Sequence, residues 1–223
     1  MCLDTGRMTK MGIEIRPARA ADAPFLAEVL AMAGRGHLPL GPWDLLFPDA
    51  RERRRALAQL AGGGVRSWCH HSLFQVVDRD GEAGAALVAF EPEELGEVSL
   101  GRPLFDVFQR LGWQPDRIAA VGPLLAPYLR CFPDMPPGSW IVENVGTRAD
   151  LRRQGLVRSL LERALATGRS RGHRRAQISC LIGNLPAQRA YEKAGFAVVE
   201  ERADAEFERM LGAPGFSRMT QAL

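Results

Sequence analysis

The residues with the clearest chemical potential lie in an Arg-rich turn at 145–157, Val-Gly-Thr-Arg-Ala-Asp-Leu-Arg-Arg-Gln-Gly-Leu-Val. The pattern predicts a strand before this turn and a helix that begins after Gly155. The first N–H groups of a helix lack intrahelical acceptors and the helix dipole makes that end electropositive, so an anion such as pyrophosphate fits there. Gly155 allows close approach of the main chain to a ligand, and Arg152, Arg153 and Arg158 add positive charge. An ordinary solvated turn with a basic face is the alternative that these residues leave open.

Positive charge is concentrated around this turn. The 29 basic residues exceed the 26 acids by only three. Residues 148–175, however, hold nine Arg against two acids, a local net charge of +7, so the rest of the chain carries −4. This distribution favours one polyanionic ligand at one place over a nucleic-acid surface along the whole chain. Nucleic-acid binding through residues 148–175 is a weaker alternative, because no known nucleic-acid motif is present.

Composition excludes several classes of protein. With 223 residues and 46% apolar content, the chain is long enough for a sizeable core. Four isolated cysteines indicate reduced thiols in the cytoplasm, and no Cys or His spacing suits a metal. No apolar run is long enough for a membrane helix, and the start is not a signal peptide. We expect a disordered tail at 1–10 and a single domain over 11–223.

The elements that must position the turn follow from periodicity and turn residues. The pattern predicts helices near 22–34 and 49–61, an irregular segment at 37–48, and a hairpin at 73–90. Further on it predicts strands at 140–145, 176–181 and 196–199, with a helix after each of the first two. This alternation indicates an α/β chain with mixed or parallel pairing and helices on the sheet faces. Proline-rich residues 91–138 read as an insertion with two short helices, 104–111 and 118–129.

Two sequence motifs, at residues 152–157 and 184–196, resemble those of the GNAT family of N-acetyltransferases. Residues 152–157, Arg-Arg-Gln-Gly-Leu-Val, are similar to that family's R/Q-x-x-G-x-G/A loop, with Val157 in place of a small residue. Residues 184–196 match its later N-x-x-A-x-x-x-Y-x-x-x-G-F signature through Asn184, Ala187 and Tyr191. The resemblance implies a mixed, mostly antiparallel sheet that is splayed at its centre, with flanking helices. It also implies an acyltransferase that uses acetyl-CoA as co-substrate and needs no metal.

The resemblance assigns two sets of residues. In the family, the main chain of the fourth strand holds the pantetheine arm and the loop holds the pyrophosphate. The implied cofactor-binding residues are Val145, Thr147, Arg152, Arg153, Gln154, Gly155, Leu156, Val157, Arg158, Asn184 and Ala187. The implied catalytic residues are Tyr191, which would protonate the leaving thiolate, and Glu143, which would accept the amine proton.

Each catalytic assignment has a structural alternative. Tyr191 could be a core aromatic of an amphipathic helix, and Glu143 could pair with an Arg or face the solvent. A water chain that ends in another base could also replace Glu143. By strand alternation Glu143 should share a face with Ile141 and Val145.

The acceptor is the least defined part. Transfer to a primary amine of a small molecule or peptide by direct attack is expected, without membrane or nucleic-acid partners, and a homodimer is compatible with the resemblance. The insertion holds seven acids against four Arg, which favours a cationic amine; these acids are Glu91, Glu93, Glu94, Glu97, Asp106, Asp116 and Asp134. A non-catalytic acyl-CoA sensor with the same fold is the alternative function.

Overall fold

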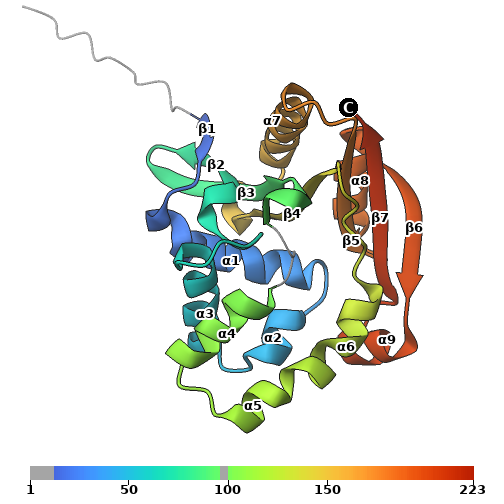
Figure 1. The fold of residues 1–223 in the computed structure, drawn as a ribbon. Coiled ribbons are helices and arrows are strands. Elements are labelled where there is room, and N and C mark those ends of the chain that lie inside the picture. Colours follow the sequence, from blue (N-terminus) through green and yellow to red (C-terminus); the bar gives the residue numbers. More distant parts are fainter. Residues whose placement is uncertain (1–12, 96–99) are drawn as a thin grey trace, which may run out of the picture.

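The computed structural model describes residues 13–95 and 100–223, and the expected tail at 1–10 lies outside these ranges. Seven strands in the described residues form one sheet in the order β1-β2-β3-β4-β5-β7-β6. All neighbours pair antiparallel except β4 and β5, which are parallel. This confirms the expected mixed, mostly antiparallel α/β fold (Figure 1). The strands are β1 (Ile13–Pro17), β2 (Phe74–Arg79), β3 (Glu82–Phe90), β4 (Trp140–Thr147), β5 (Arg175–Leu181), β6 (Ala197–Ala203) and β7 (Gly215–Ala222).

Helices cover both faces of the sheet. On one face, α1 (Ala23–Arg35) buries Leu26, Val29 and Leu30 against α3 (Ala50–Gly62) and the strands. These apolar residues recur at helical spacing, so they form one stripe that loses its contact with water. On the other face, α7 (Leu156–Ser170) buries Leu160, Leu161 and Leu165 in a second core, which also takes up residues of α8 (Leu185–Lys193).

The strands β4 and β5 pair over only three residues. The pairing runs from Trp140 with Ala176 to Val142 with Ile178 and then stops. A bulge in β4 lies just beyond this point. Val88 of β3 pairs with Glu143 and Ala86 pairs with Gly146, so β4 contains one more residue than β3 between these two pairs. Asn144 adopts a left-handed backbone conformation, with φ of 50°, within this bulge. Beyond Val142, the β5-facing main-chain groups of β4 therefore have no strand partner.

The bulge corrects one expectation from strand alternation. Glu143 was expected to share a face with Ile141 and Val145. Instead, Val145 packs against the core that holds Val142, whereas Ile141 lies in the opposite core. The extra residue in β4 shifts the period-two alternation by one position, which regular spacing cannot anticipate.

Residues 101–131, within the segment expected to be an insertion, form a helical bridge across one end of the molecule. The helices α4 (Gly101–Arg110), α5 (Pro115–Ala119) and α6 (Val121–Cys131) follow one another there, where the sequence predicts two helices. Pro115 is the first residue of α5, a position where a proline is favourable. The prolines of this segment therefore do not all mark irregular structure. The last helix, α6, contacts α2 on one side and α9, β6 and β7 on the other (Figure 1).

Two further differences from the sequence-based expectation affect the site. The segment 37–48, expected to be irregular, contains the short helix α2 (Pro42–Leu46), which again begins at a proline. The last strand, β7, has no counterpart in the expectation and lies between β5 and β6, preceded by α9 (Ala205–Leu211). The described cysteines, Cys69, Cys131 and Cys180, are buried free thiols. No helix in the described ranges has both the length and the apolarity of a membrane span.

The helix α2 is held by one buried carboxylate. Asp44 is 8% exposed and accepts hydrogen bonds from the Gly41 N–H at 2.9 Å and from Arg35 Nε at 2.8 Å. Arg53 Nη1 lies 3.3 Å from the same carboxylate. Asp44 thus joins the end of α1, the start of α2 and the side of α3 at a single point.

We expect Asp44→Asn to lower the free energy of unfolding by about 1–3 kcal/mol, because a neutral amide leaves the partly buried guanidinium groups of Arg35 and Arg53 without a charged acceptor. Urea denaturation monitored by circular dichroism measures this change. The matched control is Asp106→Asn, whose carboxylate forms an exposed pair with Arg110 one helical turn away and should cost no more than about 0.5 kcal/mol. Equal losses in the two variants would show that Asp44 does not anchor α2.

Candidate active site

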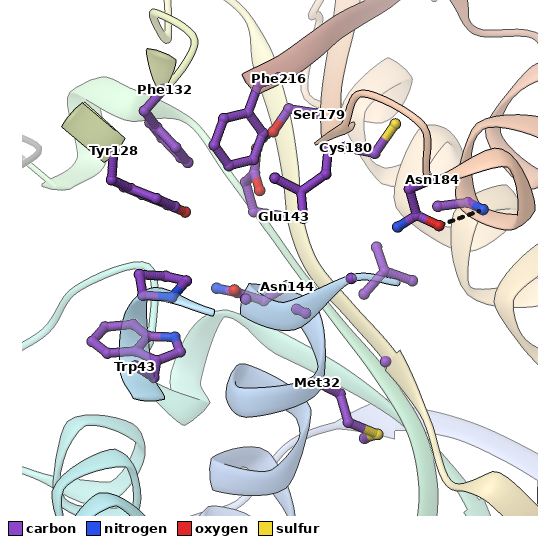
Figure 2. Close-up of a pocket in the computed structure, with 18 of the residues that line it drawn as sticks. Met32, Trp43, Tyr128, Phe132, Glu143, Asn144, Ser179, Cys180, Asn184 and Phe216 are labelled. Atoms are coloured by element: carbon purple, nitrogen blue, oxygen red, sulfur yellow. Dashed lines mark hydrogen bonds between the residues drawn. The ribbon is translucent and has the colours of Figure 1, made fainter. Parts of the chain in front are cut away.

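A cavity of about 840 Å³ opens where β4 and β5 part. Its walls come from α1, α2, α4, α6, β4, β5, α8 and β7, so it joins both halves of the chain. Figure 2 shows Glu143 and Ser179 where the strands separate, with Trp43 on one side and Tyr128, Phe132 and Phe216 on another. A volume of this size is typical of a small-molecule site.

Glu143 is the only carboxylate among the described residues that line the cavity. It is surrounded by protein except where it faces the cavity. Burial raises the pKa of Glu143 to about 7, although hydrogen bonds from the Ser179 hydroxyl and the Asn144 main-chain N–H act in the opposite direction. The Ser179 hydroxyl donates to Glu143 Oε1 at 2.6 Å. Ser179 thus reaches from β5 to β4 just where their main chains stop pairing.

Two tyrosine hydroxyls accompany Glu143. Tyr191 of α8 and Tyr128 of α6 both line the cavity, and neither hydroxyl makes a hydrogen bond within the described parts of the chain. Burial is the largest cause of the raised pKa of each tyrosine, and the charge of Glu143 adds to it. Both hydroxyls therefore remain protonated at neutral pH and can donate to a group in the cavity.

The far end of β4 leads to the Arg-rich turn. Thr147 lines the cavity, and its buried hydroxyl oxygen has no partner among the described residues. Arg152 follows on the same wall, with Nε 3.4 Å from the Thr147 carbonyl oxygen. An unpartnered buried hydroxyl is uncommon in a folded protein, so this position suits a polar ligand.

The Arg-rich turn leads into α7 with main-chain N–H groups that have no hydrogen-bond acceptor among the described residues. Arg153 and Gly155 both have left-handed backbones, with φ of 62° and 78°, which turns successive N–H groups to one side. The main-chain N–H groups of residues 154–158 find no acceptor among the described residues. A Cβ placed on Gly155 would meet no atom within 4 Å, so there is open space for a ligand beside it.

The residues assigned by the resemblance divide into two groups. Eight of them line the cavity, namely Glu143, Val145, Thr147, Arg152, Val157, Asn184, Ala187 and Tyr191. The others form the turn and the start of α7 outside the cavity wall, namely Arg153, Gln154, Gly155, Leu156 and Arg158. Leu156 is buried in the core below the turn, and Arg158 is exposed and pairs with Glu162 at 2.7 Å.

Asn184 caps α8 beside the cavity. Its side-chain oxygen accepts the Ala187 N–H at 3.4 Å, which is the dashed line in Figure 2, and its amide nitrogen is not used in that bond. The capping alternative and a ligand-facing role are therefore compatible in this geometry.

Several residues at the site were not found from the sequence. Ser179 and Tyr128 carry polar groups into the cavity, and Trp43, Trp68, Phe132 and Phe216 build its walls. Tyr128 had one available signal, because it is the only tyrosine besides Tyr191. The others lie in segments without a motif and are brought together only by tertiary folding.

The acids that the structure describes within residues 91–138 do not line the cavity. Glu94 pairs with Arg171 at 2.6 Å, Glu93 accepts the Gly138 N–H, and Asp106 and Asp134 pair with arginines outside the cavity. Glu97 lies outside the described residues. The acidity of this segment therefore gives no support to a cationic acceptor. No cluster of three or more potential metal ligands occurs in residues 13–95 and 100–223.

Comparisons with known proteins concern part of the sequence and the fold. A model of the acetyltransferase (GNAT) family matches residues 110–196, which include β4, α7, β5 and α8. No curated protein matches the chain. The fold is similar to that of a crystal structure described as an acetyltransferase, with a TM-score of 0.66, 18% identity, and coverage of 94% of this chain and 98% of that one.

Two other solved structures are also similar. An N-acetyltransferase from Staphylococcus aureus Mu50 has a TM-score of 0.66 and 16% identity, with 93% of this chain and 99% of that one covered. An agmatine N-acetyltransferase variant has a TM-score of 0.53 and 18% identity, with 95% and 99% covered. At these identities the likeness shows the shared fold.

The family match over residues 110–196 and the shared fold support an acyltransferase of the acetyl-CoA-dependent class. Residues 110–196 are thus similar to the GNAT acetyltransferases, and the chain shares the fold of solved acetyltransferases.

We expect Ser179→Ala to raise the pKa of Glu143 above its value of about 7, because the carboxylate loses a donor that stabilises its charged form. Carbon-13 NMR titration of glutamate carboxyls measures this, with the signal assigned through its loss in Glu143→Gln. Ser217→Ala is the matched control, since the Ser217 hydroxyl donates to Glu201 instead. A Glu143 pKa near 4.5 in the wild type would contradict the proposed electrostatics.

Proposed function

We propose that the chain transfers an acetyl group from acetyl-CoA to a primary amine by direct attack within this cavity. One observation carries the proposal: a carboxylate with a pKa of about 7 and an unpartnered, protonated tyrosine hydroxyl face the same cavity beside an unpaired stretch of β4. The carboxylate matches the base that an amine requires near neutral pH, and the hydroxyl matches the acid that a leaving thiolate requires.

The roles of the chain's residues follow from the chemistry. Glu143 accepts a proton from the ammonium group, which frees the nitrogen lone pair for attack on the thioester carbonyl carbon. The carbon–sulfur bond then breaks, and Tyr191 donates a proton to the thiolate. The second proton that the amide nitrogen loses restores the Tyr191 hydroxyl, and Glu143 releases its proton to water. The sum is one amide, one free thiol and one proton released to water, with no covalent intermediate on the protein.

Acetyl-CoA fits the other end of the cavity. The Thr147 hydroxyl and the β5-facing main-chain groups of β4 are available to the amide-bearing pantetheine arm. The free N–H groups of residues 154–158 and the open space beside Gly155 suit the pyrophosphate, and Arg152 supplies charge between the two. The Arg153 and Arg158 side chains would contribute to the electrostatic field from the surface.

We expect Arg152→Gln to weaken CoA binding about fivefold, because an exposed guanidinium that reaches a phosphate contributes modestly to affinity. Isothermal titration calorimetry with CoA measures this change. Arg163→Gln removes the same charge from an exposed position on α7 outside the cavity and should leave the dissociation constant nearly unchanged. If CoA does not bind to the wild-type protein, the proposed function is wrong.

We expect Tyr191→Phe and Glu143→Gln each to lower kcat by about 100-fold or more while CoA affinity changes little, because each removes a proton-transfer group and leaves the cofactor end intact. Thiol release with a saturating amine measures kcat. In the wild type, kcat/KM should rise with pH through about pH 7, where Glu143 loses its proton, and this limb should vanish in Glu143→Gln.

The control for these variants is Glu201→Gln, a carboxylate of β6 that does not line the cavity. Retained turnover in both Tyr191→Phe and Glu143→Gln would remove the assigned roles. CoA binding without turnover on any amine would instead support the acyl-CoA sensor.

A further inference from the structure

The end of the cavity that lies away from the Arg-rich turn is walled by aromatic and aliphatic side chains. We call it the acceptor end, and its aromatic residues are Trp43, Trp68, Tyr128, Phe132 and Phe216. Leucine side chains of α2, α4 and α6 fill the wall between them. The inference below rests on the proposed function, because it concerns what binds opposite acetyl-CoA.

The aromatic wall is a packed cluster. Tyr128 stacks on Phe132 with ring centroids 5.7 Å apart, and Phe216 meets both rings edge-on at 5.3 and 5.6 Å. Trp68 stacks on Phe132 at 6.5 Å. The cluster gives this end of the cavity a fixed aromatic surface, which favours a ligand with an apolar, aromatic body.

Charge is nearly absent from this wall. Among the described lining residues, Glu143 and Arg152 are the only ones with a carboxylate or a guanidinium, and none is a lysine. Arg152 lies at the turn, so the described residues give the acceptor end a single anionic group. It can neutralise one ammonium ion, and a second positive charge on the ligand would be desolvated without a partner.

The polar groups at this end converge on one position. The Tyr128 hydroxyl points into the cavity from α6, toward the same space that Glu143 faces from β4 (Figure 2). An ammonium group has several N–H donors, so it can donate to the Glu143 carboxylate and to the Tyr128 hydroxyl oxygen at once. The rest of the ligand then lies against the aromatic faces.

We infer that the acceptor is a small monoamine whose body is aromatic or otherwise flat and uncharged, bound with its amine between Glu143 and Tyr128. Among the described lining residues no second anionic group is present to pair with the second charge of a polyamine or other dication, so these should bind more weakly. This acceptor class differs from the agmatine of the similar structure, since agmatine carries two positive charges.

Calorimetry on the protein saturated with CoA tests the inference directly. The probes are 2-phenylethylamine, which has one charge and a flat body, and agmatine and 1,5-diaminopentane, which have two charges. We expect 2-phenylethylamine to bind at least about tenfold more tightly than either dication, and thiol release from acetyl-CoA to follow the same order. Equal or tighter binding of a dication, or no binding of any probe to the CoA complex, would overturn it.

A pair of variants on α6 tests the role of charge. Leu129 is 62% exposed and lines the cavity, whereas Leu124 is 38% exposed on the same helix and does not. We expect Leu129→Glu to shift the preference toward agmatine over 2-phenylethylamine by at least about threefold, since it adds a second anionic group at the wall. Leu124→Glu should leave the ratio unchanged, and an equal shift in both variants would count against the inference.

Failure of the inference is distinguishable from failure of the proposed function. Absence of CoA binding, or turnover that survives in both Tyr191→Phe and Glu143→Gln, contradicts the proposed function. Tight CoA binding with a preference for dications leaves acetyl transfer in place and contradicts only the acceptor class.

Discussion

The whole site depends on two parallel strands that stop pairing inside the protein. Main-chain N–H and C=O groups that are neither paired nor hydrated are costly, so folded chains rarely leave them so. Here β4 and β5 pair for three residues and then separate, and the bulge at Asn144 marks the point of separation. The unpaired edge of β4 is available to a ligand that brings its own amide groups. The cavity, the carboxylate at its apex and the exit toward the Arg-rich turn all follow from this separation.

The same apolar surroundings set both the acid–base chemistry and the selectivity. Burial disfavours the charge of Glu143 and brings its pKa to about 7, whereas Ser179 and the Asn144 N–H limit that shift. A wetter or more charged cavity would return the carboxylate toward its usual pKa and make it a weaker base. In the proposed function, the aromatic wall that contacts the body of the acceptor is thus also part of what raises the pKa of Glu143. The proposed preference for an uncharged body and the proposed deprotonation of the amine would then depend on the same apolar environment.

The sequence predicted the parts of the site that lie in one continuous segment and missed the parts that tertiary folding brings together from distant segments. The Arg-rich turn, Gly155 and the Asn184 cap lie in continuous strand–turn–helix units, so their spacing is visible in the chain. The prediction that Val145 shares a face with Ile141 was wrong, because a bulge at Asn144 interrupts the strand alternation. No sequence pattern around Asn144 indicates a bulge. Trp43, Phe132 and Phe216 come from three distant segments, and their meeting depends on β7 lying between β5 and β6. The acids of residues 91–138 were misleading because a segment's net charge does not say which way its side chains point.

The position of α6 explains why local sequence motifs predict one end of the cavity and not the other. The cofactor end is built from β4, α7 and α8, which follow each other closely along the chain. The acceptor end needs α6 to touch α2 from the first half and α9, β6 and β7 from the last. A change in α6 therefore alters two walls at once without disturbing the turn. Acceptor choice can accordingly change through the helical bridge while the cofactor end stays the same.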